Sequence, residues 1–208
     1  MIENPAQLRN VHKPALVPIH WQDKVYADLE RDVRIGVLEQ VSQNTPTTWC
    51  SRMVVTSKAD GTPRRTVDLQ PQNRHSVRQT HHVPSPFHLA DRVPQGMKKT
   101  VTDAWNGYHS VPIREEDRHF TTFITPWGRY RYKVAPQGFM ASGDAYNQRF
   151  DAIISNFNDK VKYVDDTCMW ANSIAAAFFP ACEWLDLCAR NGITLNPKKF
   201  QDIVSCKS

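Results

Sequence analysis

The fold is decided by the stretch Lys160-Val161-Lys162-Tyr163-Val164-Asp165-Asp166-Thr167-Cys168-Met169-Trp170, which reads as a strand, a tight turn with two carboxylates, and a second strand. A half-buried carboxylate is costly unless a cation or a hydrogen-bond donor meets it. Upstream, the strand-like run Val101-Thr102-Asp103-Ala104-Trp105 is also broken by an Asp. Three carboxylates on two strands are what a two-cation phosphoryl-transfer site needs.

The size and composition indicate a globular protein. The chain has 208 residues and 23.9 kDa, enough for one large domain or two small lobes with a real core. Hydrophobic residues make up 40% and charged residues 23%, which excludes a disordered chain. The net charge of +5 and the pI near 9.0 favour polyanionic partners such as nucleic acid.

Cysteine usage and hydropathy suggest an intracellular setting. The five cysteines are odd in number and form no Cys-x-x-Cys motif, so neither a zinc site nor a disulfide framework is predicted. These cysteines are Cys50, Cys168, Cys182, Cys188 and Cys206. No signal-peptide core is present, and no apolar run approaches the ~18 to 20 residues of a membrane span. We therefore predict a cytoplasmic or nuclear protein that is neither secreted nor membrane-bound.

Hairpins mixed with helices predict an α+β fold with an antiparallel sheet. The expected elements are a helix near 21–29, a hairpin of 51–57 with 64–69 around Asp60-Gly61, an irregular connection over 70–99, a strand at 100–105, a second hairpin of 120–125 with 129–134, a helix after Ser142, the hairpin around Asp165-Asp166, and a helix over 173–190. Ser142 is the expected N-cap of its helix. Pro180 would either kink the last helix or open a second short one.

Five blocks in a fixed order identify a resemblance. They are Arg64-Arg65-Thr66-Val67-Asp68-Leu69, Thr102-Asp103-Ala104-Trp105-Asn106-Gly107-Tyr108, Ala135-Pro136-Gln137-Gly138-Phe139, Tyr163-Val164-Asp165-Asp166 and Asn191-Gly192-Ile193-Thr194-Leu195-Asn196. In this order the chain, over about residues 30–201, resembles the reverse transcriptase domain of gypsy-type LTR retrotransposons, which is related to retroviral polymerases.

The resemblance implies the fingers and palm of a right-hand polymerase. Residues 1–44 would form an N-terminal arm and the entry to the fingers, with the fingers at about 45–78 and 111–141. The palm would occupy about 79–110 and 142–201, and 202–208 would be a truncated tail. A thumb, an RNase H domain and an integrase would belong to the remainder of a Pol polyprotein.

By the same resemblance, Asp103, Asp165 and Asp166 would hold two Mg²⁺ ions, for which Mn²⁺ can substitute. Asp103 and Asp165 are the expected ligands of both metals, and Asp166, on the other face of its strand, would support them. Lys199 would protonate the leaving pyrophosphate, with Lys198 as the competing candidate.

Other side chains would bind the substrates. The incoming deoxynucleoside triphosphate would contact Lys58 and Arg64 of the first hairpin, Tyr108 under the sugar, and the Gln137-Gly138 turn. The alternating run at 129–133 would offer Arg129, Arg131 and Lys133 to the phosphates of an RNA or DNA template with its primer. For each group there is a competing structural interpretation. The hairpin charges would be solvated, the tyrosine would be a core residue, the Gln-Gly pair would belong to an ordinary loop, and the alternating run would be an amphipathic strand with its aromatic side chains in the core.

The sequence therefore supports two functions. The first is an RNA-directed DNA polymerase that extends a primer with deoxynucleotides. The alternative is a catalytically silent nucleic-acid-binding fragment of a decayed retroelement. The histidines His75, His81, His82 and His88 are expected on the surface and not as metal ligands.

Overall fold

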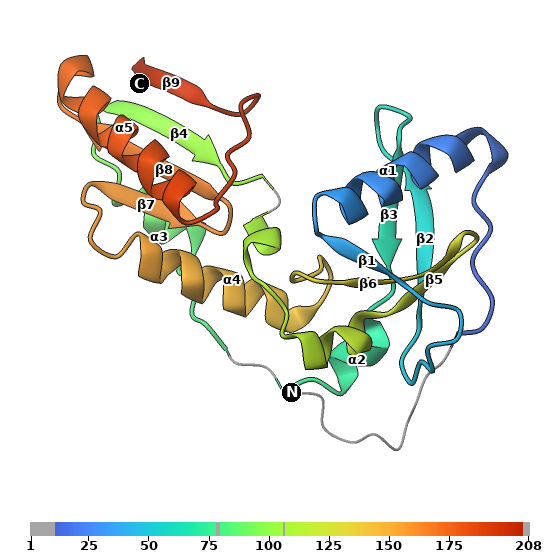
Figure 1. Ribbon diagram of the computed structural model, residues 1–208. Coiled ribbons are helices and arrows are strands. Elements are labelled where there is room, and N and C mark those ends of the chain that lie inside the picture. The colour runs from blue at the N-terminus through green and yellow to red at the C-terminus, as the bar shows by residue number, and fades with distance from the viewer. Residues whose placement is uncertain (1–10, 78–79, 106, 206–208) are drawn as a thin grey trace. The chain divides into compact units, whose positions relative to one another are not determined.

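The computed structural model describes residues 11–77, 80–105 and 107–205, and the backbone alone for 201–205. The chain divides into two compact units (Figure 1). The first unit is Met1–Gln79 with Val111–Asp144, and the second is Thr80–Ser110 with Ala145–Ser208.

A five-stranded sheet organises the first unit. Its strands are β1 (Leu38–Val41), β2 (Ser51–Ser57), β3 (Pro63–Val67), β5 (Phe123–Thr125) and β6 (Gly128–Tyr132), in the order β1-β6-β5-β2-β3. All neighbours pair antiparallel except β2 and β5, which run parallel. The predicted hairpins are present, and Gly61 has the positive φ of 78° that the first turn requires.

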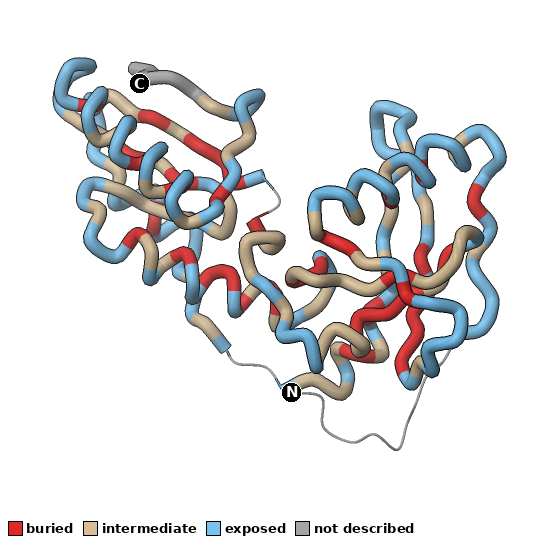
Figure 2. Tube along the Cα trace, viewed as in Figure 1, coloured by how far each residue is buried: buried red, intermediate tan, exposed pale blue. Residues whose placement is uncertain are grey.

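The core of the first unit lies between this sheet and helix α1 (Gln22–Arg34), which follows a short 3₁₀ turn at Ile19–Trp21 (Figure 2). Val25 and Leu29 are fully buried, as their four-residue spacing predicts. They pack with Met53, Phe123 and Tyr130 from the sheet. The aromatic side of the alternating strand β6 therefore contributes Tyr130 to the core.

The second unit is built on a four-stranded antiparallel sheet in the order β7-β8-β4-β9. The strands are β4 (Lys98–Asp103), β7 (Lys160–Tyr163), β8 (Asp166–Ala171) and β9 (Gln201–Ser205). Helices α4 (Met140–Ile153) and α5 (Ile174–Arg190) supply its largest buried side chains. Tyr146 and Phe150 of α4 are 1% exposed, and the ring of Phe150 lies 5.9 Å from that of Trp184 in α5.

Three expectations about local structure are wrong. The stretch 70–99 contains the short helices α2 (Gln70–Arg74) and α3 (Pro86–Ala90), each with a proline in its first turn. Residues 115–121 form a 3₁₀ helix, so the strand expected at 120–125 begins only at Phe123. Helix α4 begins at Met140, so Ser142 lies buried within the helix and is not its N-cap.

Helix α5 runs through Pro180 without a break. Its N-cap is Ser173, whose hydroxyl accepts a hydrogen bond of 3.1 Å from the N–H of Ala176. It ends at Asn191-Gly192 as predicted, with Gly192 at φ 68°. Burial of Trp184 after the proline keeps the second half of the helix on the sheet, which offsets the missing backbone donor.

Within the described residues, no helix has both the length and the apolar character that crossing a membrane requires. None of the four cysteines in that part of the chain forms a disulfide, and Cys206 lies outside it.

Candidate active site

The two carboxylates of the β7–β8 hairpin sit at a strained turn. Tyr163 pairs with Asp166, which leaves Val164 and Asp165 as the turn residues. Val164 has φ 53°, a left-handed conformation that is uncommon for a β-branched residue and concentrates at functional sites. The N–H of Ala104, just after β4, donates a 2.8 Å hydrogen bond to the carbonyl of Asp165 and holds the turn against the central strand.

Strand register brings Asp103 to this turn. Asp103 is the last residue of β4 and lies directly opposite Asp166 of β8. Opposite residues of an antiparallel pair project from the same face of the sheet. The expectation that Asp166 points away from the other carboxylates is therefore wrong, because it was drawn from strand alternation without the register.

Burial and mutual repulsion shape the charges of this site. Burial raises the pKa of Asp165, and the negative charges of Asp103 and Asp166 raise it further. The hydroxyl of Tyr146 opposes this shift, although neither it nor Oδ1 of Asp165 completes a hydrogen bond of normal geometry. Burial also raises the pKa of Asp166, with Asp103 adding to the shift and Lys199 opposing it.

A lysine neutralises part of this negative charge. The ammonium of Lys199 lies 2.7 Å from Oδ2 of Asp103. This hydrogen bond raises the pKa of Lys199. The backbone of the Thr194–Asn196 segment is bonded to the end of β4, including Asn196 N–H to the Asp103 carbonyl at 2.9 Å, and so delivers Lys199 to the carboxylates. The neighbouring Lys198 is exposed.

The oxygen atoms of this site suit a divalent cation. Within the described residues, no group of three or more His, Cys, Asp or Glu side chains already has a metal-binding arrangement. The carboxylates nevertheless fit a hard cation, because Oδ1 of Asp165 is buried without a hydrogen bond and Oδ2 of Asp103 already binds a positive charge. Such a cation would have to take the place of the Lys199 ammonium at Asp103.

Tyr108 lies beside this group on a 3₁₀ turn (Gly107–Ser110), and burial followed by the charge of Asp165 raises its pKa. Its ring packs 5.3 Å from that of Tyr146. A Cβ at Gly107 would overlap the Tyr146 ring, so only glycine permits this approach. The four-residue spacing of Tyr146 and Phe150 is typical of a buried helix face, but it gives no sign that the Tyr146 hydroxyl lies near Asp165.

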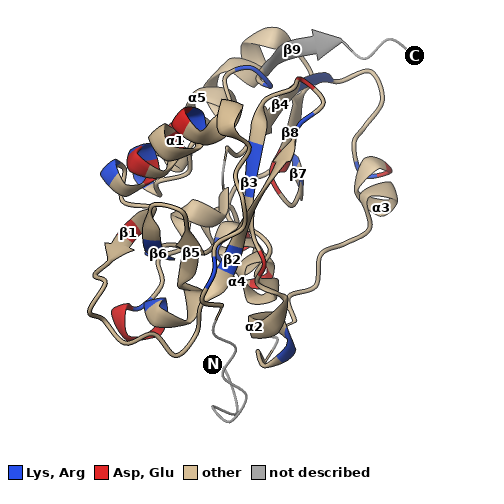
Figure 3. Cartoon of the chain, turned by 90° about the vertical axis from the view of Figure 1, so that its right-hand side faces the viewer, with Lys and Arg blue, Asp and Glu red and all other residues tan. Residues whose placement is uncertain are grey.

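The remaining nucleotide-site candidates belong to the first unit. Lys58 and Arg64 are exposed at the β2–β3 hairpin, where Figure 3 shows basic residues along β3. Gln137 and Gly138 are exposed in the turn before α4, and Gly138 has φ 87°. Sequence reasoning missed Asn73, whose side chain clamps this turn through Gly138 O and Met140 N, both at 2.8 Å.

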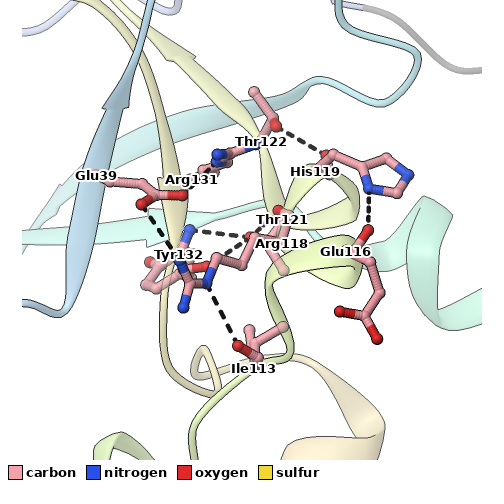
Figure 4. A network of polar contacts seen from close by, with 9 residues as sticks. All are labelled: Glu39, Ile113, Glu116, Arg118, His119, Thr121, Thr122, Arg131 and Tyr132. Carbon is pink, nitrogen blue, oxygen red and sulfur yellow. Dashed lines mark hydrogen bonds and ion pairs between the residues drawn. The ribbon is translucent and has the colours of Figure 1, made fainter.

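The basic residues of β6, and Lys133 just after it, have partners within the first unit. The guanidinium of Arg129 donates to the carbonyls of Ser42 and Gln43 at 2.8 and 2.9 Å. Figure 4 shows Arg131 bonded to Glu39, which Arg118 also approaches, at 3.5 Å. Lys133 contributes its backbone N–H and carbonyl to bonds with Val37 and Ile113. A phosphate contact by Arg129 or Arg131 would therefore compete with internal bonds.

Two of the four histidines are not simple surface residues. His82 and His88 are exposed as expected. His75 is half-buried against Trp49, with ring centroids 5.7 Å apart. His81 is half-buried and its Nε2 lies 2.7 Å from Oδ2 of Asp151 in α4. A contact distant in sequence covers part of each ring, so these two histidines are only partly exposed.

Comparisons with known proteins identify the family of the chain. Residues 51–207 match the family described as reverse transcriptase (RNA-dependent DNA polymerase). The chain is 22% identical over 209 residues to a putative enzymatic polyprotein of Cassava vein mosaic virus, covering 96% of this chain and 32% of that protein. It is 25% identical over 145 residues to the enzymatic polyprotein of Cauliflower mosaic virus (strain Strasbourg), covering 69% and 21%. The chain thus spans about a third or less of these curated relatives.

Solved structures share the fold. The foamy viral protease-reverse transcriptase in complex with RNA/DNA hybrid superposes with a TM-score of 0.85 at 15% identity, over 97% of this chain and 27% of that one. Its complex with double-stranded DNA gives 0.84 at 15% identity, over 93% and 34%. The chain therefore has the mixed α+β fold of reverse transcriptase fingers and palm, in which every strand pair except β2 with β5 is antiparallel.

Proposed function

The chain belongs to the reverse transcriptase (RNA-dependent DNA polymerase) family, and on that premise we propose that it is the catalytic part of an enzyme that adds deoxynucleotides to a primer 3′-hydroxyl. One observation carries the proposal. Asp103, Asp165 and Asp166, which lie 62 and 63 positions apart in the chain, converge at the end of one hairpin, where their charges repel one another.

We assign the metal site to these three carboxylates. Mg²⁺, or Mn²⁺ in its place, would when bound make the primer hydroxyl a better nucleophile and stabilise the charge of the leaving pyrophosphate. The buried, unbonded Oδ1 of Asp165 supports this assignment, as does the cation already held at Asp103. Asp166 is a candidate ligand on equal terms with Asp165, since it faces Asp103 directly.

Lys199 is our candidate for the general acid. Its hydrogen bond to Asp103 raises its pKa, so Nζ carries a proton at neutral pH and can give it to an oxygen of the leaving pyrophosphate. Lys198 is the weaker candidate, because in this structure Lys199 is the lysine that contacts a site carboxylate.

The first unit would form the fingers and the second the palm. In that assignment Lys58 and Arg64 bind the triphosphate, and Gln137 with Gly138 contacts the sugar-phosphate side of the nucleotide. Tyr108, held by Tyr146, would sit under the sugar and exclude a 2′-hydroxyl by its bulk. Arg129, Arg131 and Lys133 remain candidates for template or primer phosphates.

The parent protein would be a longer Pol polyprotein. We propose a gypsy-type retrotransposon origin, working in a cytoplasmic element particle or in the nucleus. Thumb, RNase H and integrase segments would complete the polyprotein. The relatives that match are viral enzymatic polyproteins, which supports the polyprotein context more directly than the gypsy subtype.

The test is deoxynucleotide incorporation on a poly(rA)–oligo(dT) duplex with Mg²⁺ or Mn²⁺, using this chain alone and joined to its polyprotein. We expect Asp165→Asn to abolish incorporation, while Asp60→Asn, in an exposed turn, leaves it intact. Full incorporation by the Asp165→Asn variant would reject the metal role. Salt-sensitive duplex binding with no incorporation by either form would favour a silent nucleic-acid-binding fragment.

A further inference from the structure

A buried lysine lies on the strand that leads into the carboxylate turn. The side chain of Lys162 in β7 is only 6% exposed, although lysines are almost never buried without a partner. Its ammonium donates to Oδ1 of Asn147 at 2.8 Å and pairs with Oδ1 of Asp151 at 3.1 Å. It also lies 5.1 Å from the ring centre of Phe150 and 5.9 Å from that of Tyr146. All four partners belong to α4.

Asp151 has contacts other than this lysine. Its other carboxylate oxygen meets Nε2 of His81 at 2.7 Å, and its side chain is 41% exposed to water. The lysine, by contrast, is nearly inaccessible. Burying the ammonium of Lys162 in such an ion pair costs desolvation free energy, so stabilisation of the fold alone does not explain a lysine at this position.

The position of Lys162 connects this anchor to the strained turn. Lys162 pairs with Thr167 across the hairpin, and the next pair, Tyr163 with Asp166, closes the turn. The turn places Val164 at φ 53°, and such a conformation persists only when its surroundings hold it. The lysine fixes one arm of the hairpin to α4, and Ala104 N–H fixes the turn itself.

The charge of Lys162 also reaches the site. Burial lowers the pKa of Lys162, while Asp151 and Asp165 raise it. Reciprocally, the positive charge of Lys162 favours the ionised form of Asp165 against the effect of burial. Asp165 therefore has a buried cation on its α4 side as well as the exposed Lys199 near Asp103.

We propose that Lys162 is a positioning residue of the polymerisation site, which anchors β7 to α4 and so holds the Val164-Asp165 turn with Asp165 ready for a divalent cation. The inference rests on the proposed function, since it assigns Asp165 to that cation. In addition to the three carboxylates, the site would require a buried positive charge at position 162.

The test compares Lys162→Met with Lys160→Met, a matched loss of a lysine on the same strand and face. In the metal-free chain, exchange of the Ala104 amide reports whether the turn is held, since that amide bonds to Asp165 O. Mn²⁺ titration followed by electron paramagnetic resonance reports the site itself. We expect Lys162→Met to speed Ala104 exchange and to raise the Mn²⁺ dissociation constant, each at least tenfold. Lys160→Met should change both less than twofold.

A double variant, Lys162→Met with Asp151→Leu, separates positioning from simple charge pairing. Replacing both ions by apolar groups should restore the melting temperature that Lys162→Met loses. If Lys162 positions the turn, fast Ala104 exchange and weak Mn²⁺ binding persist in the double variant. Recovery of both, or unchanged Ala104 exchange in Lys162→Met, would overturn the proposal.

Failure of the proposed function gives a different result. If the wild-type chain and Asp165→Asn bind Mn²⁺ alike, the carboxylate assignment is rejected. Ala104 exchange that still responds to Lys162→Met, and not to Lys160→Met, would in that case support the hold on the turn independently of the metal.

Discussion

The ammonium of Lys199 lies 2.7 Å from Oδ2 of Asp103, so a positive charge already occupies one of the oxygens that a divalent cation would need. The Lys199 side chain is 60% exposed and can move into water, whereas Asp103 is 8% exposed, so its carboxylate needs another cation when Lys199 leaves. Lys199 is thus both a competitor of the metal and the candidate acid for the leaving group.

Replacing Lys199 should therefore separate metal binding from catalysis. We expect Lys199→Met to bind Mn²⁺ a few-fold more tightly, because exposed ion pairs are weak competitors. Incorporation should nonetheless fall by about 10²-fold or more, because the general acid is lost. Lys198→Met is the control, with both quantities near wild type. Weaker Mn²⁺ binding by Lys199→Met would contradict the competition.

Without a bound metal, the charge of Asp165 should lower the stability of the fold at neutral pH. The pKa of Asp165 in the folded chain is raised above the ordinary value of 3.8. The ionised carboxylate therefore destabilises the folded state, most fully at pH values above that raised pKa. Asp165→Asn should raise the melting temperature at pH 7 without metal, and the gain should shrink as the pH falls toward 3.8.

Asp60→Asn is a control of opposite sign for this measurement. Hydrogen bonds from Thr62 lower the pKa of Asp60, so its ionised form is favoured above pH 3.8 and its loss should destabilise slightly at pH 7. A melting temperature for Asp165→Asn that is lower than wild type at pH 7 and insensitive to pH would count against the electrostatic account.

Gly107 should tolerate no side chain. A Cβ there would overlap the ring of Tyr146, which packs against Tyr108. We expect Gly107→Ala to lower the free energy of unfolding by about 1–3 kcal/mol, as overpacking of a core does. Gly143→Ala in helix α4 has open space and should be neutral or slightly stabilising. Equal effects of the two in urea titrations would show that the Tyr146 contact is unimportant.

Strand β6 and the adjoining Lys133 offer a test of the phosphate-binding assignment. Lys133→Ala should reduce the slope of log binding constant against log salt by about 1, as the loss of one phosphate contact predicts. Arg131→Ala should instead lower stability by roughly 1 kcal/mol, because its guanidinium bonds to Glu39. Duplex binding at several salt concentrations decides this, and an unchanged slope for Lys133→Ala would remove that residue from the interface.

The sequence predicted the features that repeat or alternate. The spacing of Val25 with Leu29, the turn at Asp60-Gly61 and the Asp165-Asp166 hairpin are all present. Predictions made from the chemistry of a single residue failed where a contact distant in sequence decided the local structure. Ser142 has a capping side chain, but Asn73 accepts the Met140 N–H and the helix begins there. Of the two outcomes expected at Pro180, a second short helix is absent, because helix α5 continues through the proline and its next turn buries Trp184.

The site was predictable in its composition but not in its arrangement. Asp103 and Asp165 stood out because carboxylates interrupt apolar strands, yet only the register places Asp166 opposite Asp103. The network of Lys162 with Asn147 and Asp151 depends on a contact between a strand and a helix that no local pattern encodes.

The most direct test counts Mn²⁺ ions bound in a complex with template–primer and a non-hydrolysable deoxynucleotide. It uses the polymerase region of the polyprotein that contains this chain, in wild-type and Asp103→Asn forms. The account predicts two bound ions for the wild-type protein and their loss in the variant. The same number of ions in both, or none in the wild type despite a folded complex, would contradict it.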